Sequence, residues 1–293
     1  MLPDGFTKRM QTLLGADFDA FAASYDRPRS VGLRLNPLKT DAPPALAQFG
    51  LSPVPWAENG FYYDGASRPG LSPYHDAGLY YLQEPSAMAP AGLLDVHPGE
   101  RVLDLCAAPG GKSTQLAAAL RGEGLLVCNE IHPKRARILS GNIERLGIAN
   151  ALVLNEHPKQ LAERFPCWFD KILVDAPCSG EGMFRKEEAA VTDWSEETVA
   201  MCARRQQEIL HSAAAMLRGG GWSIRPAPSR RRKTREPSAR FCTRIPIFIL
   251  RRSTRRGFRP DAPTGSATPR RVWSTHSASG RTACAARGTM PPS

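Results

Sequence analysis

The chain of 293 residues lacks several features that would place it in common protein classes. No apolar run approaches the roughly eighteen residues that a membrane-spanning helix needs. The N-terminal segment M-L-P-D-G-F-T-K-R-M lacks the basic-then-apolar pattern of a secretory signal. We therefore expect a cytoplasmic protein without a membrane partner.

Cysteines are few and irregularly placed. The seven cysteines show no disulfide-framework spacing, which favours a reducing compartment. No pair of cysteines has metal-ligand spacing alongside histidines, so we expect no metal site.

Most of the chain has no excess of positive charge, although the net charge is +11. Residues 223–293 hold 16 arginines and one lysine against two acids. Residues 1–222 therefore hold 22 bases and 26 acids, a net charge of −4. Because the basic character belongs to the C-terminal segment, the net charge alone does not indicate a nucleic-acid-binding body.

Short apolar segments alternate with helical patterns in the middle of the chain. We expect strands over 102–105, 125–129, 151–155 and 171–175, and helices over 113–120, 133–146, 158–164 and 195–217. This alternation predicts an α/β fold with a parallel, doubly wound, Rossmann-like sheet in a core domain of residues 76–222.

Residues 1–75 are expected to form a small α+β domain before this core. A helical pattern covers 6–24 and a strand pattern covers 31–35, followed by a short helix over 42–49 and a strand with a turn over 54–63. Such a domain either caps the core or grips a substrate, and composition does not separate the two.

Residues 101–112, R-V-L-D-L-C-A-A-P-G-G-K, combine a strand, a small-residue turn and the start of a helix. Gly110 and Gly111 allow a sharp turn and close approach to a ligand, and the helix start favours an anionic or polar cofactor. Glu130 follows Gly111 by 19 residues, at the end of the next strand. An acid at this spacing binds ribose hydroxyls in nucleoside-binding α/β folds, so the pattern predicts a nucleoside cofactor.

A second loop with chemical potential follows the fourth expected strand. Asp175 leads into A-P-C-S-G-E-G-M-F-R-K, residues 176–186. Since ligands bind at the carboxyl ends of strands in open α/β sheets, this loop should lie beside the cofactor. A lone cysteine is usually a small buried hydrophobe. Cys178, however, follows a proline on a glycine-rich loop near two basic residues, which favours a chemical role.

These segments resemble the Sun-type RNA 5-methylcytosine methyltransferases. The matching segments are Q-E-P-S-A-M at 83–88, D-L-C-A-A-P-G-G-K at 104–112, N-E-I-H-P-K-R-A at 129–136 and D-A-P-C-S-G-E-G-M-F-R-K at 175–186. The resemblance covers residues 6–221 and is strongest to the bacterial branch that acts on small-subunit ribosomal RNA. It implies S-adenosylmethionine as cofactor, ribosomal RNA as partner, an RNA-binding N-terminal domain and a monomer.

The resemblance also assigns roles to individual residues. The cofactor's methionine and ribose would be wrapped by Cys106, Ala107, Ala108, Pro109, Gly110, Gly111 and Lys112. Glu130 would hold the ribose hydroxyls, with Arg135 supporting it. Asp175 would lie between cofactor and target base, and the adenine contact would fall near residues 155–157.

The family's chemistry uses two cysteines. Cys178 would assist product release, and the nucleophile would come from a Thr-Cys pair at the end of a fifth strand. Its thiolate adds to C6 of cytosine so that C5 can attack the methyl group, and loss of the C5 proton then expels the cysteine. The base must be unstacked or single-stranded to be reached.

The Thr-Cys pair is missing where the resemblance places it. After glycines 219–221 the chain continues W-S-I-R-P-A-P-S-R-R-R-K, where we expect neither a strand nor the nucleophile. Cys242 and Cys284 remain as candidates, but no strand pattern precedes either, so we expect both to be bystanders.

The composition of residues 223–293 fits three interpretations: a disordered basic RNA-binding arm, a separate structured module, or out-of-frame translation of a GC-rich gene. The ratio of 16 arginines to one lysine, beginning inside an expected structural element, favours the third. We therefore expect a disordered tail and a core without its later strands. An exposed sheet edge would weaken cofactor binding and impair methyl transfer.

Two other functions stay open. A degenerate methyltransferase core with an arginine-rich arm would be a noncatalytic RNA-binding protein. A DNA cytosine methyltransferase would use its Pro-Cys cysteine as the nucleophile instead.

Overall fold

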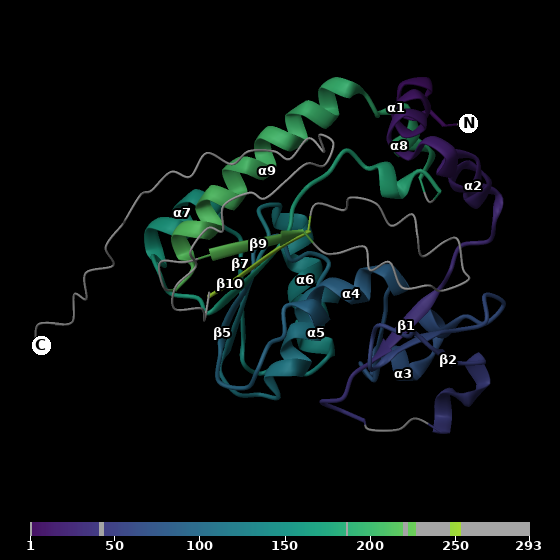
Figure 1. The fold of residues 1–293 in the computed structure, drawn as a ribbon. Coiled ribbons are helices and arrows are strands. Elements are labelled where there is room, and N and C mark those ends of the chain that lie inside the picture. Colours follow the sequence, from purple (N-terminus) through teal and green to yellow (C-terminus); the bar gives the residue numbers. More distant parts are fainter. Residues whose placement is uncertain (1, 41–43, 186, 219–221, 227–246, 253–293) are drawn as a thin grey trace, which may run out of the picture.

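The computed structural model describes residues 2–40, 44–185, 187–218, 222–226 and 247–252. Two sheets organise these residues (Figure 1). The small antiparallel sheet, sheet A, has the order β2-β3-β1-β4 and consists of β1 (Gly32–Leu35), β2 (Ser52–Pro53), β3 (Gly60–Tyr62) and β4 (Tyr80–Leu82). The large sheet, sheet B, has the order β7-β6-β5-β8-β10-β9 and consists of β5 (Arg101–Asp104), β6 (Leu125–Asn129), β7 (Ala151–Leu154), β8 (Lys171–Asp175), β9 (Trp222–Pro226) and β10 (Ile247–Arg252).

The four predicted strands of the core form the parallel part of sheet B. β5 pairs in parallel with β6 on one side and with β8 on the other, and β7 extends the sheet beyond β6. The strand order therefore reverses between β5 and β8. In α/β sheets this reversal is the place where ligands bind, at the carboxyl ends of the strands.

Helices cover both faces of sheet B, which gives three layers. The helices of the described residues are α1 (Asp4–Leu14), α2 (Phe18–Ala23), α3 (Pro73–Asp76), α4 (Ala89–Leu93), α5 (Gly111–Leu120), α6 (Pro133–Arg145), α7 (Pro158–Arg164), α8 (Glu188–Thr192) and α9 (Glu196–Met216). One buried cluster joins α4, α5 and α6 to one face of the sheet, and a second joins α7 and α9 to the other. The alternation of Val102 and Leu103 between these clusters reflects the two-residue period of a strand. Both faces are apolar because both are covered.

Sheet B continues beyond β8, so the expectation that its later strands are missing is wrong. β10 pairs antiparallel with β8, with Ile247 opposite Asp175, and β9 pairs antiparallel with β10. Ile249 and Leu250 are buried on opposite faces of the sheet and extend both apolar clusters over the edge of β8. Phe248, Ile249 and Leu250 carry this packing, although arginines dominate the composition around them. Residues 227–246 and 253–293, with Cys242 and Cys284, lie outside the described residues.

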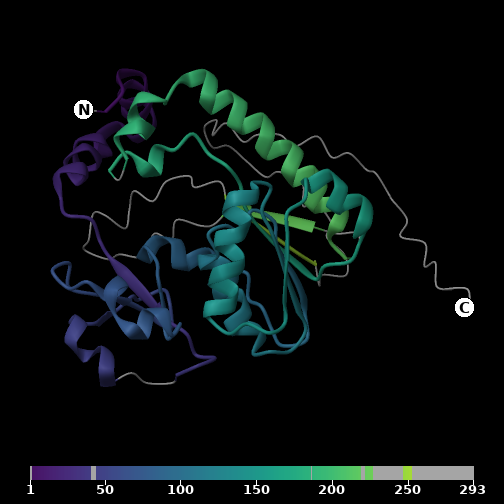
Figure 2. The same cartoon turned by 180° about the vertical axis from the view of Figure 1, so that it is seen from behind.

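The N-terminal residues contribute to two separate places. Residues 32–82 hold sheet A, whereas α1 and α2 pack on the segment around α8 (Figures 1 and 2). Phe6 and Phe21 of these helices form one buried cluster with Phe184 and Trp194. The expected single helix over 6–24 is broken at Gly15, which has a φ of +53°. Composition of the first 75 residues does not predict this separation, because the aromatic partners lie far along the chain.

The described residues contain no helix that is both long and apolar enough to cross a membrane. Within the same ranges, no group of three or more histidine, cysteine, aspartate or glutamate side chains is arranged to hold a metal ion. Cys106, Cys128, Cys178 and Cys202 are free thiols. Cys167 is disulfide-bonded, which the cysteine spacing does not predict.

Candidate cofactor and catalytic site

The turn between β5 and α5 forms the centre of the candidate site. Gly110 closes the turn with a φ of +112°, a conformation that side chains rarely adopt. A Cβ at Gly110 would lie 3.1 Å from Leu139 Cδ1, so α6 also restricts this position. The amide of Ala107 donates to the carbonyl of Asn129 over 2.8 Å, which ties the turn to the end of β6. The backbone is therefore fixed where the first turn of α5 presents its free N–H groups.

Asp104, the last residue of β5, places a buried carboxyl at the start of this turn. Its side chain is 1% exposed, and Ser113 Oγ donates to Oδ2 over 2.7 Å. The other oxygen, Oδ1, is buried and has no hydrogen-bond partner among the described residues. Burial raises the pKa of Asp104 to about 7, and Ser113 partly offsets that effect. A buried acceptor without a partner is uncommon, and here it marks a place for a ligand's donor group.

Glu130 lies on the other side of the turn, directly after β6. Its side chain is 3% exposed; Oε1 accepts from the amide of His132 over 3.0 Å. Arg135 Nη1 lies 3.4 Å from Oε2, and Arg135 Nη2 donates to the carbonyl of Ala108 over 2.8 Å. Arg135 thus joins the acid to the glycine turn. The structure brings together Glu130, which the spacing after Gly111 predicts, and Arg135, which the resemblance alone places beside it.

The segment after β7 borders the same acid. Asn155 Nδ2 donates to the backbone carbonyl of Glu130 over 2.6 Å. Asn129 contributes a second connection, because its Oδ1 accepts from the amide of Glu156 over 3.0 Å and its Nδ2 donates to Leu105 over 3.3 Å. Residues 155–157 therefore lie beside Glu130, where the resemblance places the adenine contact. Sequence reasoning misses Asn129, whose only signal is an amide at the end of an apolar strand.

An ion pair connects the two loops at the carboxyl edge of sheet B. Lys112 Nζ, from the first turn of α5, lies 2.7 Å from Asp175 Oδ2 at the end of β8. Both side chains are largely covered, with 16% and 27% exposure, so water screens the pair only partly. Cys106 lies in the glycine turn, where burial, with Asp104 and other acids nearby, raises the pKa of its thiol. A thiol with a raised pKa is a poor nucleophile at neutral pH, so we assign Cys106 to packing.

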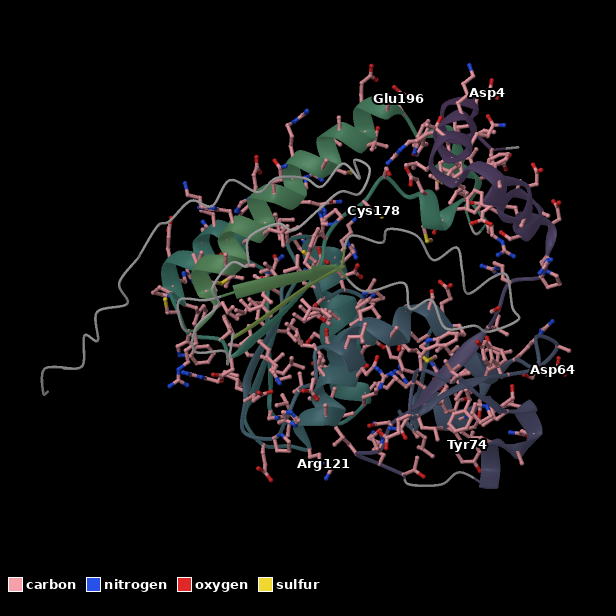
Figure 3. The ribbon with its side chains drawn as sticks, in the orientation of Figure 1. Asp4, Asp64, Tyr74, Arg121, Cys178 and Glu196 are labelled. Atoms are coloured by element: carbon pink, nitrogen blue, oxygen red, sulfur yellow. The ribbon has the colours of Figure 1, made fainter. Side chains whose placement is uncertain are left out.

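Cys178 lies on the loop after β8 and is an exposed free thiol (Figure 3). Gln206, on α9, donates from Nε2 to the carbonyl of Pro177 over 2.8 Å. Farther along the loop, Glu181 Oε1 accepts from Arg9 Nη1 over 2.9 Å and from Trp194 Nε1 over 3.1 Å. The loop is thus held by α9 near its start and by the N-terminal helix α1 farther on. Sequence reasoning misses both contacts, because nothing local marks a partner so distant in the chain.

The strand beside β8, where the resemblance places the nucleophilic cysteine, is present but carries no cysteine. The strand beside β8 is β10, and neither β10 nor β9 contains a cysteine. No Thr-Cys pair occurs anywhere in the sequence. The cofactor side of the site is therefore assembled, and the described strands supply no thiol opposite Cys178.

A mostly parallel sheet with a glycine turn after β5, a buried acid after β6 and a polar loop after β8 defines the class of Rossmann-like proteins, in which this edge is the usual place for a nucleoside cofactor. Known protein families narrow this class further. The family model of 16S rRNA methyltransferase RsmB/F matches residues 91–227, and that of the N-terminal domain of 16S rRNA methyltransferase RsmF matches residues 2–85. The chain belongs to the bacterial, RsmF-like branch of the Sun-type RNA methyltransferase family.

Curated relatives and solved structures agree with this assignment. Ribosomal RNA small subunit methyltransferase F of Escherichia coli is 39% identical over 232 residues, and that of Vibrio parahaemolyticus is 38% identical over the same length. Each alignment covers 75% of this chain and 48% of the relative, so the chain spans about half the length of these relatives.

Two archaeal structures share the fold. A methyltransferase homolog protein from Pyrococcus horikoshii is 30% identical, with a TM-score of 0.64, over 75% of this chain and 71% of that one. NSun6 from the same organism, solved with SFG, aligns with a TM-score of 0.65 over 76% of this chain and 82% of its own. Its 17% identity supports the fold alone.

Proposed function

We propose that residues 101–186 form the cofactor half of an S-adenosylmethionine-dependent methyltransferase that makes 5-methylcytosine in small-subunit ribosomal RNA. We further propose that this chain transfers the methyl group poorly or not at all, because it lacks the Thr-Cys nucleophile. The observation that carries the proposal is the assembly around one glycine turn of a buried acid with a free oxygen, a second buried acid and the loop of Cys178.

The residues around the turn match the chemistry of the methyl donor. Glu130 accepts two hydrogen bonds readily and suits the two ribose hydroxyls. Asp104 Oδ1, which has no partner among the described residues, suits the cationic amino group of the donor's methionine part. Gly111 and Lys112, in the first turn of α5, would present backbone N–H groups to its carboxylate, whereas the amide of Gly110 donates to the carbonyl of Ala107 over 2.8 Å. When bound, the donor supplies an electrophilic methyl group on sulfur.

The loop after β8 provides the side that faces the target base. Asp175 is held by Lys112 at the boundary between the two loops. The exposed thiol of Cys178 is free to reach a substrate that approaches from solvent. In this role Cys178 would assist loss of the C5 proton and so release the methylated base.

The missing step is the first one. Cytosine C5 becomes nucleophilic enough only after a thiolate has added to C6. Neither β9 nor β10, the strands described after α9, carries a cysteine, and Cys178 is assigned to the later step. The chain should therefore bind the methyl donor without completing the transfer.

Two measurements on the unaltered chain test the proposal. Isothermal titration calorimetry with S-adenosylhomocysteine, the product form of the donor, should show saturable binding. A labelled-methyl assay on small-subunit ribosomal RNA should show no 5-methylcytosine above background. A positive control joins residues 1–221 to the C-terminal part of the Escherichia coli relative, which is expected to restore transfer.

Each outcome separates one part of the proposal from the others. Robust 5-methylcytosine formation by the unaltered chain would contradict the missing nucleophile, and absence of binding would contradict the cofactor site. In the joined chain, Cys178→Ala should trap covalent RNA. Loss of activity without a trapped complex would assign Cys178 to the first step instead.

A further inference from the structure

A buried arginine of sheet A contacts the cofactor turn of the core. Arg34, in β1, is 3% exposed, and burial lowers the pKa of its guanidinium to about 10. Its Nη2 donates to the carbonyl of Gly111 over 3.0 Å and to Thr114 Oγ1 over 2.6 Å. Its Nε donates to Gln83 Oε1 over 3.0 Å. No acid forms an ion pair with Arg34 within the described ranges.

Burying the Arg34 guanidinium with no acid paired to it among the described residues lowers the stability of the fold, so we expect a functional reason for it. A buried charge without a counter-ion loses its hydration, and neutral hydrogen-bond partners compensate only in part. A purely apolar contact would join the two parts of the chain more cheaply. Arg34 instead donates hydrogen bonds to the first turn of α5. The amides of this turn face the proposed cofactor.

Tyr81 of β4 and Gln83, which follows that strand, lie against the same turn. A Cβ built on Gly111 would lie 3.1 Å from Tyr81 Cε1 and 3.3 Å from Gln83 Nε2. Gln83 is itself held, because its Nε2 donates to the carbonyl of Ala87 over 3.0 Å. On the opposite side of α5, Ser113 bonds Asp104. Adjacent residues of one helical turn are thus fixed by sheet A and by β5.

We propose that Arg34 is a positioning residue for the cofactor site: through Gly111 and Thr114 it holds the first turn of α5 in the orientation that binds the methyl donor. The affinity for the donor then depends on sheet A, which lies outside the segment that carries the cofactor motifs. The inference rests on the proposed function.

A second contact between sheet A and the core provides a matched control. Asn36 lies two residues after Arg34, and its Nδ2 donates to the carbonyls of Gly78 and Leu146, each over 2.9 Å. It joins the same two parts of the chain but at the C-terminal end of α6, away from the glycine turn. Loss of Asn36 should loosen the junction without disturbing the cofactor turn.

The test compares Arg34→Met, Arg34→Lys and Asn36→Ala in the full chain. For each variant we measure the Kd for S-adenosylhomocysteine by calorimetry, the midpoint of thermal unfolding, and hydrogen–deuterium exchange without ligand. Arg34→Met should raise the Kd about tenfold or more, since hydrogen bonds from a charged donor are lost. Arg34→Lys keeps the charge but not the planar fork, so its Kd should lie in between.

The control separates positioning from general loosening. Asn36→Ala should lower the unfolding midpoint while the Kd changes by less than about twofold. Exchange should accelerate over residues 110–116 in Arg34→Met and near residues 78 and 146 in Asn36→Ala. Where Arg34→Met does not fold, Thr114→Val removes the hydroxyl that Arg34 contacts, and the same rise in Kd is expected.

Two results would overturn the inference. An unchanged Kd in the Arg34 or Thr114 variant would show that the turn keeps its orientation without Arg34. An equal rise in Kd for Arg34→Met and Asn36→Ala would reduce Arg34 to one contact of the junction among others. In both cases the unaltered chain still binds, so the proposed function stands. If the unaltered chain itself does not bind, both ideas fall together.

Discussion

The carboxyl edge of sheet B has two halves, the glycine turn after β5 and the loop after β8. They differ in burial and in the elements that contact them. Around the glycine turn, Asp104 and Glu130 are at most 3% exposed and are fixed by hydrogen bonds from neighbouring elements. The loop after β8 carries an exposed thiol and depends on contacts from α9 and α1. The cofactor half is therefore built into the core, whereas the loop half is attached to it from outside.

This difference suits the two tasks. A cofactor of constant shape is bound best by a site already in its final geometry, because ordering the site on binding costs free energy. A base that must leave its stack to reach the enzyme needs a surface open to solvent. Under the proposed function, the missing Thr-Cys pair would therefore affect the chemistry more than the cofactor site.

The largest expected effect concerns Asp104, whose pKa burial raises from 3.8 to about 7. Between these values the folded chain keeps a proton that the unfolded chain releases. The free energy of unfolding therefore falls as pH rises from about 4 to about 7, by about 1.4 kcal/mol per unit, and levels off above. Asp104→Asn should remove this slope. Chemical denaturation between pH 4 and pH 8 measures it, and an unchanged slope would place the buried proton elsewhere.

A smaller effect is expected from Glu130→Gln. The variant keeps the shape of the side chain but loses the charge that pairs with Arg135 and accepts from the ligand. The Kd for S-adenosylhomocysteine should rise about 10-fold to 100-fold, since hydrogen bonds to a charged group contribute roughly 1.5–3 kcal/mol. Glu144→Gln is the matched control, because Glu144 is exposed on α6 and accepts from Ser140 instead. Equal effects of the two variants would argue against a specific role for Glu130.

The two halves also differ in how far the sequence predicts them. Short-range patterns predict the glycine turn and Glu130. An apolar strand ends at the glycine turn in the first case and at the acid in the second. The contact of Arg9 with Glu181 spans 172 residues, and no local pattern records it. β10 escapes prediction for another reason. Its apolar run at 247–250 is only four residues long, yet it pairs with both β8 and β9, while the surrounding arginines set the average composition.

A moderate effect is expected from Gln206→Leu, which acts only on the loop half. The carbonyl of Pro177 loses its donor, which should cost about 1 kcal/mol of folding stability. The Kd for S-adenosylhomocysteine should stay the same. The rate of Cys178 alkylation should change, because the loop that carries this thiol loses a contact. Gln207→Leu, at the exposed neighbouring position, controls for the added apolar side chain. A weakened Kd in Gln206→Leu alone would show that the two halves are coupled.

The smallest effect is expected where the loop half is most open. Cys178→Ser replaces an exposed thiol and should change the free energy of unfolding by less than about 0.5 kcal/mol. Cys128→Ser makes the same exchange in β6, where the side chain is 0% exposed and burying a more polar hydroxyl in place of the thiol costs roughly 1–3 kcal/mol. Urea unfolding compares the two directly. Alkylation should then lose one fast-reacting thiol in Cys178→Ser and none in Cys128→Ser, because reaction rate follows access to solvent. Equal stability losses would mean that Cys178 packs inside the loop, and the contrast between a built-in and an attached half would no longer hold.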